Sequence, residues 1–318
     1  MNTAGVLGAI GQVVVTIAGA PLLVGLMRQV RARLEGRAGA GVGQPCRDLR
    51  KLAGKEAISP AGTGPVFRAA PAVLLGTGVV TAAVVPSASL VGPLDSGVDL
   101  FAVVALLALG TAALALAGLD TGTAFGGLGA SRGITVLALV EPTILLAVFA
   151  LSVPVGTTNL ATIVAAARRS PTHQLAPVSL LAAVALGVVI IAETGRLPVD
   201  NPSTHLELTM IHEAMVLEYA GPDLAVVELA GAVRLAVLLG LFATLFAPWG
   251  LTSGLVGLPV ALLLLVGKVA VLGALLAAGE VFAAKVRLFR VPELLAGSFL
   301  LALLAVAGSY FLTAGGPP

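Results

Sequence analysis

The chain has 318 residues, of which 58% are hydrophobic and 11% are charged, and its mean hydropathy is +1.06. Soluble domains average about 25% charged residues, so this composition excludes a soluble protein and indicates an integral membrane protein. The formal net charge is only +2, and no nucleic-acid partner is expected. A single cysteine, Cys46, excludes an internal disulfide and any multi-cysteine metal site.

Apolar segments recur along the whole chain. A membrane-spanning helix needs about 20 mostly apolar residues. Eight such segments are predicted, at residues 3–27, 69–91, 98–119, 133–155, 176–192, 226–248, 255–279 and 294–313, the fifth being short. The linkers leave no room for a separate soluble domain, so residues 1–318 are predicted to form a single all-α membrane domain, a bundle of about eight transmembrane helices.

Basic residues are distributed unevenly between the loops. The first loop, residues 28–68, carries nine of the 18 Lys and Arg residues, and the third, fifth and seventh loops add five more. The loops on the other side carry only Arg168 and Arg169. Because cytoplasmic loops are enriched in Lys and Arg, loops 1, 3, 5 and 7 are predicted to be cytoplasmic, with both termini outside.

The first and third loops are rich in glycine. In the first, "EGRAGAGVGQP" cannot be helical throughout, whereas "PCRDLRKLAGKE" predicts a helix that begins at Pro45 and lies on the membrane surface. Its basic residues either only fix the topology or form a docking surface for a cytoplasmic partner. The third loop, "LDTGTAFGGLGASRG", lacks the Lys of a phosphate-binding loop, which argues against nucleotide binding.

Ionisable residues inside the predicted spans are candidates for function, because a charge at the bilayer centre costs from about 2.5 to more than 10 kcal/mol. Five lie within spans or at their ends: Glu141, Glu193, Arg234, Lys268 and Glu280.

Each of these residues has a functional and a structural interpretation. Glu141 precedes a proline that frees a main-chain carbonyl, so a proton-path role is favoured over a structural ion pair. Lys268 lies deep in its span and is expected to pair with Glu141, Glu193 or Glu228. Arg234 is expected to snorkel to the cytoplasmic interface. Glu280 is expected to form an interfacial ion pair, with a transport role as the alternative.

The fifth loop gathers charge, since residues 193–228 hold seven of the 16 carboxylates and two of the three histidines. Pro198 and Pro202 disfavour helix in the residues before them, so "ETGRLPVDNP" is predicted to be extended and turning. From Thr204, a suitable N-cap with Glu207 three residues later, the sequence "THLELTMIHEAMVLEY" predicts a helix.

Three interpretations of that predicted helix are open. The first is a solvated amphipathic helix. The second is a buried polar lining whose carboxylates pass protons toward the membrane. The third is a metal site, because "HEAMV" begins like the zinc motif HExxH. Val216 occupies the place of the second histidine ligand, so a metal site is disfavoured.

The fifth-loop sequence "ETGRLPVDNPSTHLELTMIHEAMVLEY" closely resembles the equivalent loop of the formate hydrogenlyase subunit 4 family, the membrane anchor of group 4 NiFe-hydrogenases. Its shorter core, ExxRxPxD, also resembles the H-type membrane subunit of bacterial NADH:quinone oxidoreductase (complex I). Further similarity lies in "RARLEGRAGAG" of the first loop, Glu141 in the fourth span and "AKVRLFRVPE" after the seventh span. The resemblance therefore covers most of the chain.

This resemblance implies a subunit that docks a soluble electron-transfer arm and couples it to ion translocation in a bacterial or archaeal cell membrane. The implied partners are hydrogenase-like large and small subunits, an iron–sulfur protein and antiporter-like membrane subunits. The NiFe centre and iron–sulfur clusters are expected in those partners, and no cofactor or metal in this chain. The implied docking-loop residues are Arg37, Arg196, Asp200, His205 and His212. The proton-path candidates are Glu141, Glu193, Glu207, Glu213, Glu218, Glu228 and Lys268.

Two other functions are weighed against this one. A quinone-site subunit of a complex I-like oxidoreductase is the main alternative. The segment "THLELTMIHEAM" departs from the more acidic and aromatic continuation of that branch, and aromatic residues make up only 4% of the chain. An independent transporter is the third possibility, but no internal repeat supports inverted halves.

Overall fold

The computed structural model describes residues 3–90, 92, 99–169, 176–200, 210–252, 254–284 and 286–314. The long helices in this part of the chain are α1 (Thr3–Leu34), α3 (Pro65–Val84), α4 (Leu100–Asp120), α5 (Ala124–Ser152), α7 (Pro177–Glu193), α9 (Gly221–Phe246), α10 (Leu258–Phe282) and α11 (Val291–Ala314). The shorter helices are α2 (Gln44–Ala53), α6 (Leu160–Arg169) and α8 (His212–Val216), with 3-10 turns at Val153–Val155 and Leu288–Arg290.

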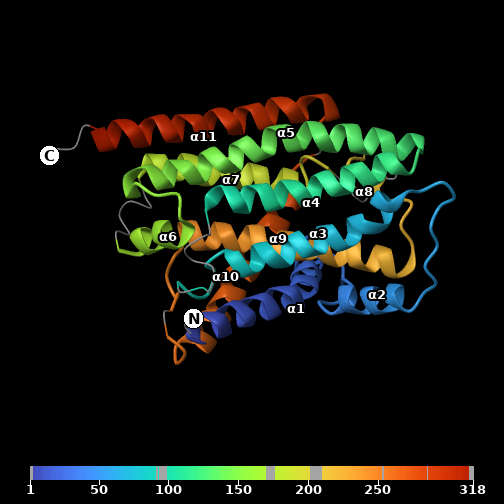
Figure 1. Ribbon diagram of the computed structural model, residues 1–318, viewed down its shortest axis with the longest axis horizontal. Coiled ribbons are helices and arrows are strands. Elements are labelled where there is room, and N and C mark those ends of the chain that lie inside the picture. Colours follow the sequence, from blue (N-terminus) through green and yellow to red (C-terminus); the bar gives the residue numbers. More distant parts are fainter. Residues whose placement is uncertain are drawn as a thin grey trace.

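The long helices correspond one to one with the eight predicted spans. Within the described ranges, seven are long and apolar enough to cross a membrane, and α7 is a shorter apolar helix of 17 residues. The predicted class, an all-α integral membrane bundle, is confirmed. In Figure 1 the helices run nearly side by side, and both chain ends lie at the end of the bundle away from α2 and α8.

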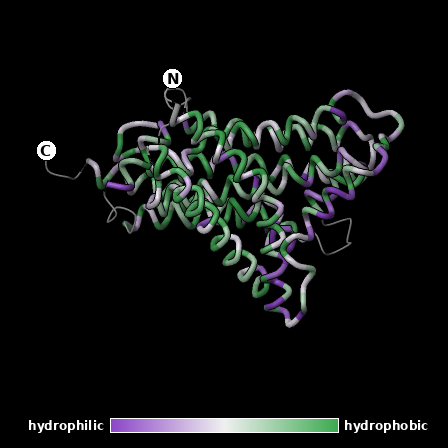
Figure 2. Tube along the Cα trace, turned by 90° about the horizontal axis from the view of Figure 1, so that it is seen from below, coloured by the Kyte–Doolittle hydropathy of each residue, from purple (hydrophilic) through white to green (hydrophobic). Residues whose placement is uncertain are grey.

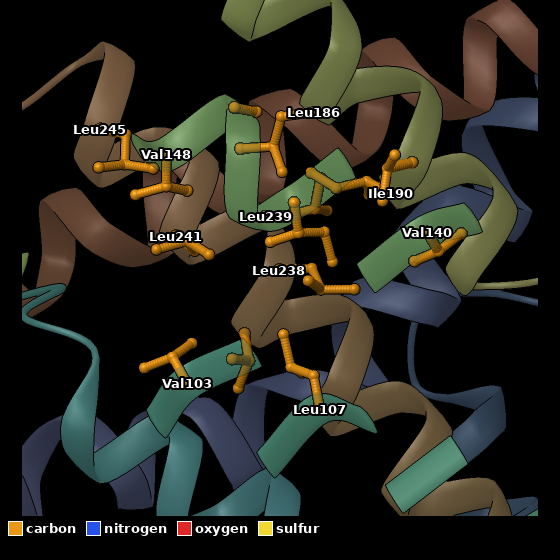
Figure 3. Close-up of a cluster of buried hydrophobic side chains, with 14 of the residues drawn as sticks. Val103, Leu107, Val140, Val148, Leu186, Ile190, Leu238, Leu239, Leu241 and Leu245 are labelled. Carbon is orange, nitrogen blue, oxygen red and sulfur yellow. The ribbon is translucent and has the colours of Figure 1, made fainter. Parts of the chain in front are cut away.

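Helix α9 forms the centre of the bundle, where it packs against α1, α3, α7 and α10. A helix that is apolar all round is stable only when neighbours or lipid surround it, and most of α9 is buried by protein. Figure 3 shows Leu238, Leu239 and Leu241 of α9 among side chains of α4, α5 and α7. Helices α10 and α11, by contrast, leave most of their surface uncovered, as expected for a boundary with lipid or other membrane subunits.

Hydrophilic segments gather toward one end of the bundle, as Figure 2 shows. Helix α2 lies there and packs against α1 and α9. It begins with Pro45 in its first turn, as predicted. Leu49 and Leu52 are half-buried while Arg47 and Arg50 are exposed, so its polar face is free to meet water or a partner.

The fourth span was predicted to begin at residue 133, but its helix, α5, begins nine residues earlier, within the glycine-rich third loop. Helix α5 begins at Ala124, where the Thr123 hydroxyl accepts the Gly126 N–H at 3.2 Å. The glycines weaken a helix by about 1 kcal/mol each, but here they allow close packing. A Cβ at Gly126 would overlap the Gly118 carbonyl of α4, and one at Gly129 would lie 2.8 Å from the Ala214 Cβ.

A long helix was also predicted from Thr204. Residues 201–209 lie outside the described residues, and from Met210 onward the prediction is wrong. Met210 and Ile211 are not helical, and α8 covers only His212–Val216. The Asp200 carboxylate accepts the main-chain N–H groups of Ile211 and His212 at 3.1 and 3.3 Å, which fixes the start of α8 at this point.

Candidate functional site

A buried ion pair joins the end of α7 to the middle of α9. Glu193, the last residue of α7, accepts a hydrogen bond from the Arg234 guanidinium and a second, of 2.8 Å, from the Thr111 hydroxyl of α4. Arg234 also donates to the Leu107 carbonyl at 2.7 Å. The side chains of Glu193 and Arg234 are 2% and 10% exposed, so each charge is compensated by the other and by hydrogen bonds to α4 rather than by bulk water.

The expectation that Arg234 snorkels to the interface is therefore wrong. Glu193 and the Leu107 carbonyl provide acceptors inside the bundle, so the guanidinium does not need water. Gly110 makes the required space, because a Cβ there would lie 2.9 Å from Arg234 Nη1. Sequence reasoning missed Thr111 and Gly110 as members of this cluster, since a Thr and a Gly in an apolar helix carry no distinguishing signal.

Glu141 of α5 belongs to the same electrostatic cluster. Its carboxyl group interacts with the charges of both Glu193 and Arg234. Its Oε1 atom is buried and has no hydrogen-bond partner among the described residues. Buried polar atoms are almost always hydrogen-bonded, if necessary to water, so this oxygen marks a position where an ordered water would be held.

His212 connects the cluster to the fifth loop. Gly195, two residues after Glu193, has φ of +59°, a left-handed conformation that glycine adopts at low cost. A Cβ at Gly195 would lie 2.8 Å from His212 Nδ1, so the imidazole packs directly on this turn. Nδ1 is buried and has no partner among the described residues. Burial lowers the pKa of His212, although the charges of Glu193 and Asp200 oppose the shift.

Glu213, next to His212 on α8, lies in an acidic environment. Burial raises the pKa of its carboxyl group, and the charges of Glu228 and Asp200 raise it further. Glu228 itself is exposed at the start of α9, and Glu218 is half-buried after α8. Of the acids proposed for a proton path, Glu213 and Glu228 thus lie at the hydrophilic end, outside the Glu193 cluster.

Arg196 and Asp200 hold the first part of the fifth loop in place. This part is made mostly of turns, since the Val199 and Asp200 N–H groups both donate to the Arg196 carbonyl. Arg196 Nη1 lies 3.1 Å from Glu280 Oε1 of α10, and the other Glu280 oxygen lies 3.9 Å from Arg31 Nη1 of α1. The Val286 N–H donates to the Pro198 carbonyl at 2.9 Å. The ion pair expected of Glu280 is confirmed. Arg196 and Asp200, predicted as docking residues, make contacts within the chain.

Lys268 does not pair with Glu141, Glu193 or Glu228, so that expectation is wrong. Its ammonium group donates to the carbonyls of Ala247, at 2.6 Å, and Trp249. It also lies 4.3 Å from the centre of the Trp249 ring. Main-chain carbonyls just beyond the C-terminus of α9 lack helical donors, and they supply the acceptors in place of a carboxylate.

The other predicted residues are peripheral or outside the described part. Arg37 is exposed and pairs with Glu35. His205 and Glu207 lie outside the described residues. Within the ranges that the structure describes, no three His, Cys, Asp or Glu side chains are close enough to hold a metal ion.

The sequence is similar to those of known hydrogenase, formate hydrogenlyase and NADH dehydrogenase proteins. Residues 7–310 match the NADH dehydrogenase family. Formate hydrogenlyase subunit 4 of Escherichia coli (strain K12) is 35% identical over 298 residues, covering 92% of this chain and 95% of that protein. Hydrogenase-4 component C of the same organism is 36% identical over 248 residues, 77% of this chain and 76% of that protein. NADH-quinone oxidoreductase subunit 8 of Rhodothermus marinus is 30% identical over 239 residues, 71% of this chain and 68% of that protein.

The fold also matches a solved structure. A chain of the membrane-bound sulfane sulfur reductase, an archaeal respiratory membrane complex, superposes with a TM-score of 0.82. The match covers 95% of this chain and 98% of that one at 21% identity, which shows the shared fold alone. The resemblance predicted from the fifth loop is confirmed by the sequence relatives. This multi-pass membrane chain belongs to the NADH dehydrogenase family, with formate hydrogenlyase subunit 4, hydrogenase-4 component C and NADH-quinone oxidoreductase subunit 8 as its relatives.

Proposed function

We propose that the chain is the membrane anchor and ion-pathway subunit of a formate hydrogenlyase-like or group 4 NiFe-hydrogenase complex. It couples redox chemistry in a soluble arm to the translocation of H⁺ or Na⁺. The names of the two relatives at 35% and 36% identity support the type of complex. The observation that carries the ion-pathway role is the buried pair of Glu193 and Arg234 where the fifth loop leaves α7, together with the partly buried Glu141 of α5, which interacts electrostatically with both.

Electrostatic interactions between ionisable groups support a path from the fifth loop into the bundle. Asp200 interacts electrostatically with both Glu213 and His212. Glu193 interacts in the same way with His212 and with Glu141. His212 Nδ1 and Glu141 Oε1 are both buried without a partner among the described residues, and such atoms bind ordered water. A proton taken up at the fifth loop would pass along these groups and waters.

The hydrophilic end of the bundle is the proposed docking face. Loop 1 with α2, and loop 5 with α8, lie at this end (Figure 1). The partners proposed for it are hydrogenase-like large and small subunits and an iron–sulfur protein, which would hold the NiFe centre and the clusters. Antiporter-like subunits would pack along the bundle in the membrane. In this arrangement the docking face is cytoplasmic and both termini are outside, as the basic residues of loop 1 favour.

The type of complex is tested by recovery of the partners. The tagged chain, extracted in mild detergent from its native membrane, is expected to bring down a soluble arm that contains nickel and iron, together with antiporter-like subunits. An iron-rich arm without nickel would contradict the hydrogenase assignment and favour a quinone-linked complex. Recovery of the chain alone would contradict the anchor role.

The docking role of the fifth loop is tested by Arg196→Ala. Among the described residues, the substitution leaves Glu280 with Arg31 as its ion-pair partner, 3.9 Å away, and removes the ion pair that joins the fifth loop to α10. Recovery of the soluble arm in detergent is expected to fall severalfold, because the loop no longer has one preferred conformation. The matched control is Arg169→Ala, an exposed arginine at the end of α6, a helix that lies away from α2 and α8 (Figure 1). Unchanged recovery with Arg196→Ala would contradict the role of the fifth loop.

A further inference from the structure

An apolar cavity of about 220 Å³ lies between α1, α3, α9 and α10. Its inner wall includes Leu23, Val85 and Val237, which are all buried. At its outer side are Leu22 of α1 and Val266 of α10, whose exposed fractions are 45% and 48%. The cavity therefore reaches the central helix from an opening between α1 and α10, and it is deeper than a groove on the outside of the bundle.

The position of the cavity along the helices places its mouth in the hydrocarbon of the bilayer. Its α1 wall runs from Val15 to Leu26, which are ~18 Å from the first residue of α1 and ~12 Å from its last residue. Apart from Thr16 and Ser87, the lining is aliphatic or glycine. An apolar cavity of this kind does not hold water, and an empty one leaves its walls without dispersion contacts. The chemistry of the wall therefore fits a hydrocarbon chain.

Basic side chains lie near one end of the cavity. Val42 lines it, and the Val42 carbonyl is pressed against α1 so closely that a Cβ at Gly25 would overlap it. Helix α2 begins two residues later, and three of its side chains, Arg47, Arg50 and Lys51, are exposed. A cationic surface next to a hydrocarbon-binding cavity matches the two parts of an anionic phospholipid.

We propose that one acyl chain of an anionic phospholipid occupies this cavity, with its headgroup on the basic face of α2. The lipid fills space within the bundle that protein side chains leave open, and it ties α2 to the α1–α10 boundary. This inference is independent of the hydrogenase-type function.

Two glycines give a way to close the cavity without disturbing its walls. Gly19 and Gly240 both line it. A Cβ at Gly19 would have no atom within 4 Å, and one at Gly240 would meet only Leu265 Cδ1, at 3.9 Å. Leucine at either position therefore extends into the free volume, and both changes favour the helix over glycine. Gly267 of α10 is the matched control, since it is exposed, has equal space and does not line the cavity.

The test is native mass spectrometry of the full chain, released from detergent after reconstitution with a mixture of phosphatidylglycerol and phosphatidylethanolamine. Wild type and Gly267→Leu are expected to retain one phosphatidylglycerol, and Gly19→Leu and Gly240→Leu to lose it at least about tenfold, a change of about 1.4 kcal/mol. Arg50→Gln with Lys51→Gln is expected to remove the preference for the anionic lipid. Equal retention by the cavity variants and the control would overturn the site, and so would retention of an isoprenoid quinone instead.

A second measurement uses the wild-type chain, so it does not depend on how the variants fold. A phosphatidylglycerol with a photoreactive diazirine in the middle of one acyl chain is expected to label α1 between Val15 and Leu26, or α9 between Ala236 and Gly240. Labelling restricted to the exposed faces of α10 and α11 would show ordinary boundary lipid and overturn the proposal.

Discussion

The buried pair of Glu193 and Arg234 makes a quantitative prediction about stability. Replacing Arg234 with Met keeps the bulk of the stem but leaves the Glu193 carboxylate, among the described residues, with the Thr111 hydroxyl at 2.8 Å as its remaining side-chain donor. Removing one partner of a buried ion pair costs about 3–5 kcal/mol, because the other charge stays buried without compensation. Thr111→Val removes only one hydrogen bond to a charged group and is expected to cost about 1.5–3 kcal/mol.

The double variant Glu193→Met with Arg234→Met distinguishes the contribution of the ion pair from the cost of leaving one of its charges buried without a partner. Replacing both ions with apolar groups removes the unpaired charge, so the double variant is expected to cost less than either single variant. The assay is reversible unfolding of the full chain in mixed micelles, followed by circular dichroism as the fraction of SDS is raised. A cost below about 1 kcal/mol for Arg234→Met, the value of an exposed pair, would refute the reasoning. A cost of the double variant equal to the sum of the two single costs would refute it as well.

Two residues of the fifth loop, His212 and Glu213, are expected to change the stability of the chain with pH in opposite directions. Burial holds the pKa of His212 below its ordinary value, so below about pH 6.5 the unfolded chain takes up a proton that the folded chain does not. Stability should fall as the pH drops from that value, and His212→Gln should remove this part of the dependence in the same micelle assay, run from pH 5 to 8. The pKa of Glu213 is raised instead, so stability is lost as the pH rises through the folded value. Glu213→Gln should therefore stabilise the chain at neutral pH and change little below about pH 4.5; a destabilised variant at pH 7 would contradict this.

The helices were predictable because their cause is local. Runs of about 20 apolar residues are stable in lipid only as helices, and neighbours in sequence determine this. Internal prolines did not alter the outcome: Pro21, Pro71 and Pro142 all lie within continuous helices. The start of α5 was misjudged because the cost of glycine is local, whereas its benefit, close contact with α4 and α8, depends on the tertiary arrangement.

The candidate site was predictable as a set of residues but not as a set of contacts. Glu141, Glu193, Arg234 and Lys268 stood out because charge is expensive in lipid. Their partners depend on packing between distant segments. Thr111 and Glu193 are 82 residues apart, and Lys268 uses main-chain carbonyls, which every residue has. Sequence reasoning therefore assigned Lys268 a carboxylate that it does not have and left Arg234 at the interface.

The measurement that tests the central claim most directly is ion translocation by the assembled complex carrying Glu141→Gln, in sealed inverted membrane vesicles. The variant keeps the shape of the side chain but removes its capacity to carry a proton. Glu293→Gln, at an exposed acid in the first turn of α11, is the matched control. We expect electron transfer to continue in both variants and the number of ions moved per electron to fall severalfold only in Glu141→Gln. A wild-type ratio in the assembled Glu141→Gln complex would contradict the ion-pathway role.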